Sequence, residues 1–270
     1  MKALALLLII FSSLAQAAPK KDCQRTYRVS VNPIAPVSYR DENGKIRGIA
    51  RDLGEVLTRK TGCRFSIEEE PTFEVWRSLQ NDRTDMTMVN IENATPAASF
   101  GHFILFYTVP RSFVTRRELL TEGTTWQSLF ANKKLKFVGL IGVDFFYSSE
   151  EIAELKKQKR WIEVVGLEEA FSLIAQKRAD VIVSSPGATH INLQRMGLND
   201  QLHWVLDEKN LRNAGMYVSK RRLNKEEFEM IKSAIESLKD EGWFKDNLKK
   251  YIDSSYQRVE QKKVPAKNPQ

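Results

Sequence analysis

Two stretches of this chain carry the same succession of a helix end, a polar turn and an apolar strand. LQNDRTDMTMVN (79–90) and IAQKRADVIVSS (174–185) both place Arg-x-Asp directly before a run of apolar residues. Each stretch ends a predicted β-α-β-α-β unit, and this alternation is typical of a parallel sheet with right-handed crossovers. The repeat therefore predicts an α/β fold of two similar lobes, each a parallel-rich sheet flanked by helices.

Apolar periodicity supports both units. Residues 49, 53, 56 and 57 form one apolar face of a helix that ends at Gly62. The first unit is predicted as strand 27–31, this helix, strand 65–67, helix 74–80 and strand 86–89. The second is predicted as strand 136–141, a helix opened by a capping box at 148–151, strand 162–165, helix 167–177 and strand 181–183.

The repeat also assigns roles to the two ends of each final strand. We interpret Arg83–Asp85 and Arg178–Asp180 as turn and strand-start residues, because they precede their strands. Open α/β sheets bind small molecules at the opposite, carboxyl ends of the strands. Asn90 and Ser185 occupy those ends, one in each lobe. They are therefore the first candidates for a ligand site.

Both strand ends lead into predicted short helices. Thr95-Pro96 and Ser185-Pro186 each supply a hydroxyl N-cap followed by proline at the first helical position. Helix starts of this kind receive polar or anionic groups, although capping alone also explains the pattern. If the N-termini of both helices face one cleft, a ligand site is favoured over capping alone.

The chain is predicted to return to its first lobe. After Leu211 come strand 216–218 and a long amphipathic helix, so two connections join the lobes, near 109–112 and near 212–215. Two connections make a hinge. The predicted boundaries are 18–111 plus 213–255 for lobe 1, 112–212 for lobe 2, and 256–270 for a basic, disordered tail.

The N-terminus predicts export. Lys2 precedes an apolar run at 3–11 and a small-residue stretch that ends in Ala15-Gln16-Ala17, which is the pattern of a signal peptide (1–17) cleaved after Ala17. The apolar run is too short to cross a hydrocarbon core of about 30 Å as a helix. The mature protein is therefore expected to be periplasmic. An exported chain without a clustered basic stripe is a poor partner for nucleic acid, despite its formal net charge of +8.

The two cysteines, Cys23 and Cys63, each lie just before a predicted strand. In an oxidising compartment, and with the two strands as neighbours in a parallel sheet, they are expected to form a disulfide. His102, His190 and His203 show no ligand spacing with each other or with the cysteines. We therefore expect no metal site and no cofactor.

Over about residues 27–252 the chain resembles the bacterial extracellular solute-binding proteins of family 3. The resemblance is carried, in order, by YRVSVNPIAPVSYRDENGKIRGIARDLGEVLTRKTG, LQNDRTD, KRADVIVS and DEGWFKDNLKKY. It implies a two-lobed, type II periplasmic-binding-protein-like fold that closes on a small polar solute. It also implies a non-enzymatic, monomeric partner of an ABC importer.

The residues that hold amino acids in this family are missing. The family's amino-acid binders usually carry an arginine for the α-carboxylate where this chain has Ala98, and an aspartate for the α-amino group where it has Ser185. A Gly-Thr-Thr type turn is replaced by Gly142–Asp144, and an aromatic residue by Ile34. The resemblance therefore implies the fold without the usual amino-acid anchors.

The remaining candidates define an expected pocket. Glu92 and Asp144 are the only charges placed near the cleft, which favours a cationic or hydroxyl-rich ligand unless both are solvated loop residues. Trp76 is expected in the core and Arg77 on the surface. The candidate ligand-binding residues are Phe73, Asn90, Glu92, Asn93 and Thr95 in lobe 1 and Asp144, Phe145, Ser184 and Ser185 in lobe 2.

Two other functions stay open at this point. A non-transport module of the same fold would present its lobes to a membrane sensor or another protein. A dehydratase-like enzyme would need a clamp for substrate carboxylates and a positioned acid, and the missing arginine counts against it.

Overall fold

The structure is a computed structural model that describes residue 23 and residues 25–92, 96–142 and 144–251. The predicted signal peptide (1–17), the predicted tail (256–270) and two candidate site residues, Asn93 and Thr95, lie outside the described residues. They stay predictions.

The described strands form one mixed sheet of eight strands and a two-stranded hairpin. The sheet order is β4-β1-β5-β10-β6-β9-β7-β8, and β2 pairs with β3. The strands are β1 (Thr26–Val31), β2 (Tyr39–Arg40), β3 (Ile46–Arg47), β4 (Arg64–Glu69), β5 (Met86–Ile91), β6 (Gly101–Arg116), β7 (Phe137–Leu140), β8 (Trp161–Val164), β9 (Val181–Ser184) and β10 (Leu202–Ser219).

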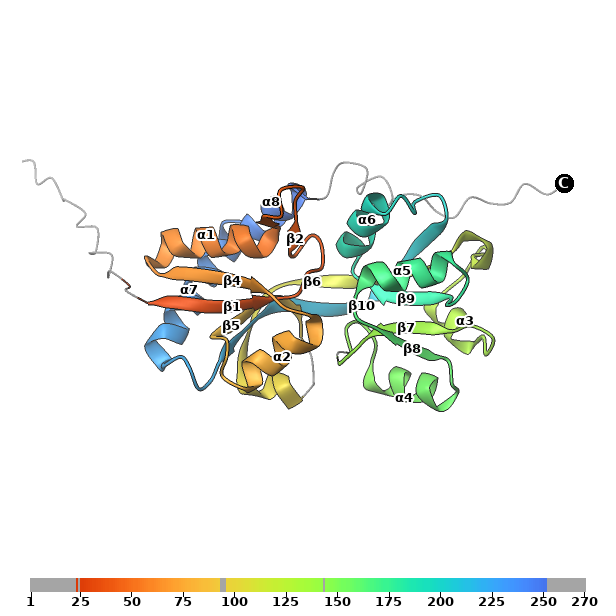
Figure 1. Ribbon diagram of the computed structural model, residues 1–270, viewed down its shortest axis with the longest axis horizontal. Helices are drawn as coiled ribbons and strands as arrows, with labels where there is room; N and C mark the ends of the chain where they lie inside the picture. The colour runs from red at the N-terminus through yellow and green to blue at the C-terminus, as the bar shows by residue number, and fades with distance from the viewer. Residues whose placement is uncertain (1–22, 24, 93–95, 143, 252–270) are drawn as a thin grey trace, which may run out of the picture.

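Helices cover both faces of this sheet in each half of the molecule. In Figure 1, α1 and α2 lie on opposite sides of β1 and β4, and α5 and α4 on opposite sides of β7 and β8. The helices are α1 (Ile49–Thr61), α2 (Thr72–Gln80), α3 (Trp126–Ala131), α4 (Ser149–Lys157), α5 (Leu167–Ala175), α6 (Pro186–Arg195), α7 (Lys225–Asp240) and α8 (Trp243–Lys249), with 3-10 turns η1 (Pro96–Phe100) and η2 (Arg117–Leu119). Within the described ranges, none of these helices has the length and apolar character needed to cross a membrane.

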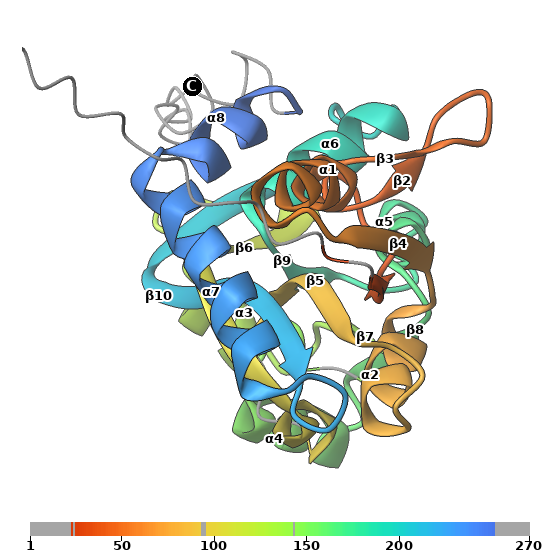
Figure 2. The same cartoon turned by 90° about the vertical axis from the view of Figure 1, so that its left-hand side faces the viewer.

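The two-lobed α/β fold predicted from the repeat is confirmed. Lobe 1 contains β1–β5, α1, α2, α7 and α8, and lobe 2 contains β7–β9 and α3–α6 (Figure 1). Within each lobe the core pairs are parallel, β1 with β4 and β5, and β7 with β8 and β9. Figure 2, which looks at the molecule from the side of lobe 1, shows α7 and α8 packed on the outside of that lobe. The exact lobe boundaries stay predictions.

Two long antiparallel strands, β6 and β10, join the lobes. They pair from Gly101–Ser219 at one end to Arg116–Leu202 at the other, with β10 against β5 in lobe 1 and β6 against β9 in lobe 2. The predicted connections, 109–112 and 212–215, lie inside these strands. The sequence prediction of a short strand at 216–218 is wrong in length, because that segment is the end of β10.

The Arg-x-Asp repeat has the same structural meaning in both lobes. The Asp85 carboxylate accepts the backbone N–H of Arg28 (2.8 Å), and the Asp180 carboxylate accepts that of Lys136 (2.8 Å). In turn, the backbone N–H of Asp85 donates to the Arg28 carbonyl, and that of Asp180 donates to the Lys136 carbonyl. The prediction that these are strand-start residues is confirmed.

Each of these aspartates is also paired with arginine. Asp85 contacts Arg25 (2.7 Å) and Arg222 (2.9 Å), and its side chain is 1% exposed. Asp180 contacts Arg116 (2.6 Å) and is 17% exposed. The two ion pairs therefore fix the starts of β5 and β9 relative to their neighbouring strands.

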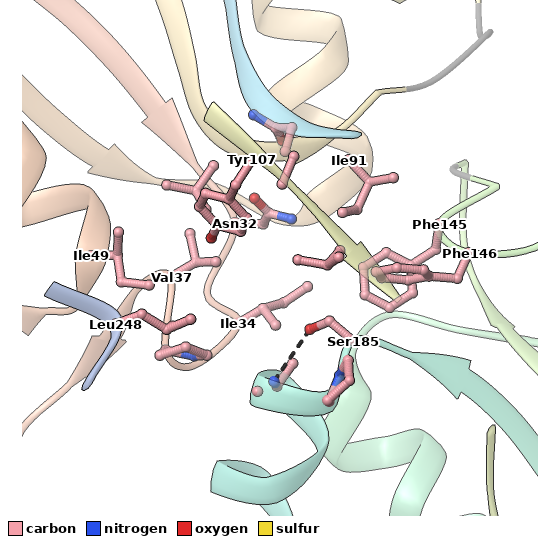
Figure 3. Close-up of a pocket in the computed structure, with 18 of the residues that line it drawn as sticks. Asn32, Ile34, Val37, Ile49, Ile91, Tyr107, Phe145, Phe146, Ser185 and Leu248 are labelled. Carbon is pink, nitrogen blue, oxygen red and sulfur yellow. Dashed lines mark hydrogen bonds between the residues drawn. The ribbon is translucent and has the colours of Figure 1, made fainter. Parts of the chain in front are cut away.

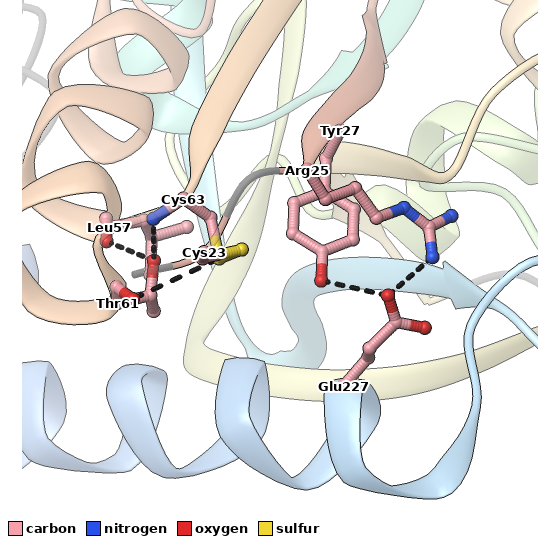
Figure 4. Close-up of a disulfide and its surroundings, with 7 residues drawn as sticks. All are labelled: Cys23, Arg25, Tyr27, Leu57, Thr61, Cys63 and Glu227. Atoms are coloured by element: carbon pink, nitrogen blue, oxygen red, sulfur yellow. Dashed lines mark hydrogen bonds and ion pairs between the residues drawn. A yellow bond between two sulfur atoms is a disulfide. The ribbon is translucent and has the colours of Figure 1, made fainter. Parts of the chain in front are cut away.

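The predicted disulfide is present between Cys23 and Cys63, which lie at the amino ends of the paired strands β1 and β4 (Figure 4). The cysteines are 40 residues apart in sequence. Closing a loop of that length is worth about 4 kcal/mol in the chain-entropy model. The bond ties the start of β1 to the end of α1.

We expect Asp85→Asn to lower the free energy of unfolding by about 3 kcal/mol, because it leaves two partly buried arginines without their shared carboxylate. Asp180→Asn removes one pair and should cost less. Asp246→Asn, at a side chain that is 70% exposed, is the matched control and should change stability by less than about 0.5 kcal/mol. Urea unfolding measures all three, and equal effects of Asp85→Asn and the control would contradict this account.

Candidate ligand site between the lobes

A cavity of about 120 Å³ lies between the lobes, beside the two strands that join them. Figure 3 shows Asn32, Val37 and Tyr107 on one side of it and Phe145, Phe146 and Ser185 on the other. Asn32 and Ile91 come from the carboxyl ends of β1 and β5, and Ser185 from that of β9. The cavity therefore lies where an open α/β sheet binds small molecules.

The walls of the cavity are mainly apolar. None of the lining residues, all of which belong to the described part of the chain, has a charged side chain. The lining residues whose side chains carry a polar group are Asn32, Thr72, Trp76, Asn90, Tyr107 and Ser185. The apolar lining residues are Ile34, Pro36, Val37, Ile49, Val89, Ile91, Val109, Pro110, Phe145, Phe146, Pro186, Ala188, Ala214 and Leu248.

Asn90 reaches the cavity through a β-bulge in β5. Thr87 faces Tyr217 and Asn90 faces Gly215, so two residues of β5 oppose one of β10. Val89, in the bulge, has a φ of 55°, which is strained for a β-branched residue. The extra residue brings Asn90 and Thr87 to the same face, where the Asn90 amide donates to the Thr87 hydroxyl (2.7 Å).

Ser185 lines the cavity as the N-cap of α6. Its hydroxyl accepts the N–H of Ala188 (3.3 Å), and Pro186 follows at the first helical position. The predicted capping role is confirmed for Ser185-Pro186. The segment after Thr95 forms only the short 3-10 turn η1, and Thr95 lies outside the described residues.

The wall of lobe 2 is held in place from behind by Tyr147. Its hydroxyl donates to the Val138 carbonyl (2.8 Å) and accepts the Val183 N–H (3.2 Å), which joins the loop after β7 to the sheet. Phe145 and Phe146, directly before it, pack edge to face with ring centroids 4.9 Å apart. The loop therefore presents a fixed aromatic surface to the cavity.

Arg77 and Arg111 are not among the residues that line the cavity. Arg111 is buried and pairs with Asp207 (2.7 Å) and Glu151 (3.2 Å), and it stacks on Trp126 at 4.7 Å. Arg77 is 63% exposed and pairs with Glu74 (2.8 Å), as expected for a surface residue. Their charges are already compensated, so neither supplies a cation to the cavity.

A wider hollow of about 520 Å³ continues from the cavity past Ile34 and Thr72, which line both. Its charged residues include Arg40, Glu69, Glu70, Glu168 and Arg195. Arg40 pairs with Glu69 (2.9 Å), and the Arg195 guanidinium of lobe 2 lies 5.2 Å from the ring centroid of Tyr39 in lobe 1. The cleft thus has an apolar inner part and a charged outer part.

The structure brings three of the predicted site residues to the cavity, Asn90, Phe145 and Ser185. Ser184 does not line it and is fully buried beneath it. Phe73 instead approaches Gly142 across the cleft: a Cβ added at Gly142 would lie 3.0 Å from the Cβ of Phe73. The ligand-binding roles of all these residues stay predictions.

Neither predicted acidic residue lines the cavity. Glu92 is exposed and accepts the Asn213 amide (2.6 Å), and Asp144 accepts the Ser149 hydroxyl (3.3 Å). The partner of Glu92 lies in β10, and the partner of Asp144 is the first residue of α4. The expectation of a cationic ligand rested on these two residues and loses its support here.

Sequence reasoning missed Asn32, Tyr107 and Leu248. Asn32 directly follows β1, so the rule that located Asn90 at a strand end would also have found it. Tyr107 belongs to a joining strand, and Leu248 to the last helix. Tyr107 lies at the cavity because β6 runs past it, and Leu248 because α8 packs beside it. No local sequence pattern predicts either arrangement.

Residues 27–254 match the family model of bacterial extracellular solute-binding proteins, family 3, and the chain belongs to this family. Among curated proteins, sensor protein EvgS of Escherichia coli (strain K12) is 22% identical over 182 residues, which cover 66% of this chain. The matched region spans only 14% of the length of EvgS.

Two solved structures place the fold among periplasmic binding proteins. A histidine kinase sensor domain with similarity to periplasmic binding proteins matches with a TM-score of 0.73 and 18% identity, covering 86% of this chain and 98% of that one. An amino acid ABC transporter substrate-binding protein from Streptococcus pneumoniae, bound to L-arginine, matches with a TM-score of 0.67 and 20% identity, covering 84% and 93%. At these identities the likeness establishes the fold alone.

Tyr107 allows a test of the cavity wall by pH. Burial raises the pKa of Tyr107 from 10.0 to about 12. Because the folded pKa exceeds the unfolded one, the stabilisation is complete below pH 10 and is lost as the pH rises from about 10 to 12. We expect Tyr107→Phe to lose less stability than the unchanged protein between pH 9 and pH 11, measured by urea unfolding. Identical losses in the two proteins would contradict the burial of this hydroxyl.

Proposed function

We propose that this chain is an exported, monomeric receptor that captures one small solute between its lobes. The observation that carries the proposal is the position of the cavity, which is formed by strand ends from both lobes beside the two joining strands. A solute bound there contacts both lobes only when they are closed. Binding therefore shifts the equilibrium toward the closed form.

We propose delivery to an ABC importer as the use of this capture. Family membership and the likeness to a transporter substrate-binding protein support it. A sensor module is the second candidate, and the matches to EvgS and to a histidine kinase sensor domain support that use. Adjacent permease and ATPase genes would favour import, and an adjacent kinase gene would favour sensing.

We propose no catalytic role. A dehydratase needs a cationic clamp for its substrate's carboxylates and a positioned acid. The described residues that line the cavity include neither a cation nor a carboxylic acid. Hydrogen-bonding groups in an apolar wall are suited to holding a ligand.

We expect none of the standard L-amino acids to bind below about 1 mM, a limit that corresponds to roughly −4 kcal/mol. Ala98 and Ser185 stand where the family's amino-acid binders carry their charged anchors, and Arg77 and Arg111 are paired elsewhere. The loss of one charge-assisted contact of ~2 kcal/mol already weakens binding about thirtyfold. Isothermal titration calorimetry is the measurement.

A thermal-shift screen of several hundred small solutes, charged and neutral, tests whether the protein used for calorimetry can bind a solute at all. A solute that raises the melting temperature shows that the cleft is competent. Micromolar affinity for any standard L-amino acid would refute the expectation, because another residue would then supply the missing charge.

A further inference from the structure

Asn32 is the polar group at the cavity that most needs a ligand. Its side-chain Oδ1 is buried without a hydrogen-bond partner, and the residue is 7% exposed. The turn after β1 holds it there, since the Asn32 carbonyl accepts the N–H of Ile34 (2.8 Å). A buried acceptor without a donor is costly and rare in folded proteins. Because this oxygen has almost no accessible surface, the Asn32 side chain must turn toward the cavity before a solute N–H or O–H can donate to it.

The described surroundings of Asn32 offer no partner to a charged solute. The lining residues, all within the described ranges, provide no cation for a carboxylate and no anion for an ammonium group. Charged side chains line the outer hollow, where Arg40 pairs with Glu69 (2.9 Å) and Glu70 accepts the Ser78 hydroxyl (2.9 Å). A buried charge without a partner is strongly unfavourable.

The start of α6 does not replace the missing cation. Pro186 has no N–H, and the N–H groups of Ala188 and Thr189 already donate to the side chain and carbonyl of Ser185. Of these first helical residues, all described by the structure, Gly187 alone has an amide that remains for a ligand. One neutral donor does not compensate a buried carboxylate.

The size and walls of the cavity define the rest of the solute. The inner cavity of about 120 Å³ is smaller than the roughly 300–1,000 Å³ of pockets for drug-sized ligands, so a solute that does not extend into the outer hollow must be compact. Phe145 and Phe146 on one side face Ile34 and Val37 on the other (Figure 3). Apolar walls of this kind favour a compact hydrocarbon body.

We infer that the solute is a small neutral molecule with an apolar body and one N–H or O–H group that donates to Asn32. This inference rests on the proposed function, because it names the solute class of the same cleft. Tyr107 and Asn90 also line the cavity and carry a hydroxyl and an amide group, of which the Asn90 amide donates to Thr87 (2.7 Å). Small amides, phenols and branched alcohols belong to this class.

Matched sets of compounds test the inference. Benzamide, benzoate and benzylammonium share one hydrocarbon body, and so do isobutyramide, isobutyrate and isobutylammonium. We expect a neutral amide to stabilise the mature protein in thermal shift and to bind in calorimetry, and the charged members to do neither. Binding of a charged member as tight as that of its neutral partner would overturn the inference, and so would binding by no member of either set.

Variants test the contact with Asn32. We expect Asn32→Leu, which keeps the approximate size but removes the acceptor, to weaken amide binding about tenfold or more. Asn43→Leu, in the exposed turn of the β2–β3 hairpin, is the control and should leave binding unchanged. Asn32→Asp should gain affinity for the ammonium members. Unchanged amide binding in Asn32→Leu, with a folded protein shown by circular dichroism, would exclude the contact.

The inference and the proposed function fail in different ways. If a charged solute from the wider screen binds and compacts the protein in small-angle scattering, the proposed function stands and the neutral class is wrong. If no solute in the screen binds or compacts it, the proposed function fails as well.

Discussion

The pairing of β6 with β10 is the constraint on which the rest of the molecule depends. These strands hydrogen-bond along their length and carry the sheet of lobe 1 into that of lobe 2. The ladder is weakest between the lobes, where Pro110 offers no N–H and the register shifts between Asp207 and Leu211. Motion of the lobes is therefore expected to concentrate there, next to the cavity.

The charges of the molecule are arranged around this joint, and the cavity is left neutral. Buried ion pairs hold the starts of β5 and β9, and Arg111 binds two carboxylates behind the wall of lobe 2. The interior of the cleft receives Asn32, Asn90, Ser185 and apolar side chains. In a family whose amino-acid binders hold their ligands through charges, this distribution explains why we propose a neutral solute.

Much of the fold could be predicted from sequence, because short local patterns indicate its helices and strands and because the same pattern occurs once in each lobe. The matching Arg-x-Asp turns located the starts of β5 and β9, and through them Asn90 and Ser185. The site was predicted only in part. Glu92 and Asp144 follow strand ends in sequence, but Glu92 hydrogen-bonds to Asn213 of β10 and Asp144 to Ser149 of α4. Tyr107 reaches the cavity through the long strand β6, whose length depends on pairing with a distant segment.

The most direct test of the account measures the distance between the lobes. Spin labels at Glu68→Cys on β4 and Glu168→Cys on α5, both exposed, report across the mouth of the cleft by pulsed electron paramagnetic resonance. The account predicts that a solute which stabilises the protein shortens and narrows this distance distribution at saturation. A distribution that stays the same with bound solute would contradict closure of the lobes about β6 and β10.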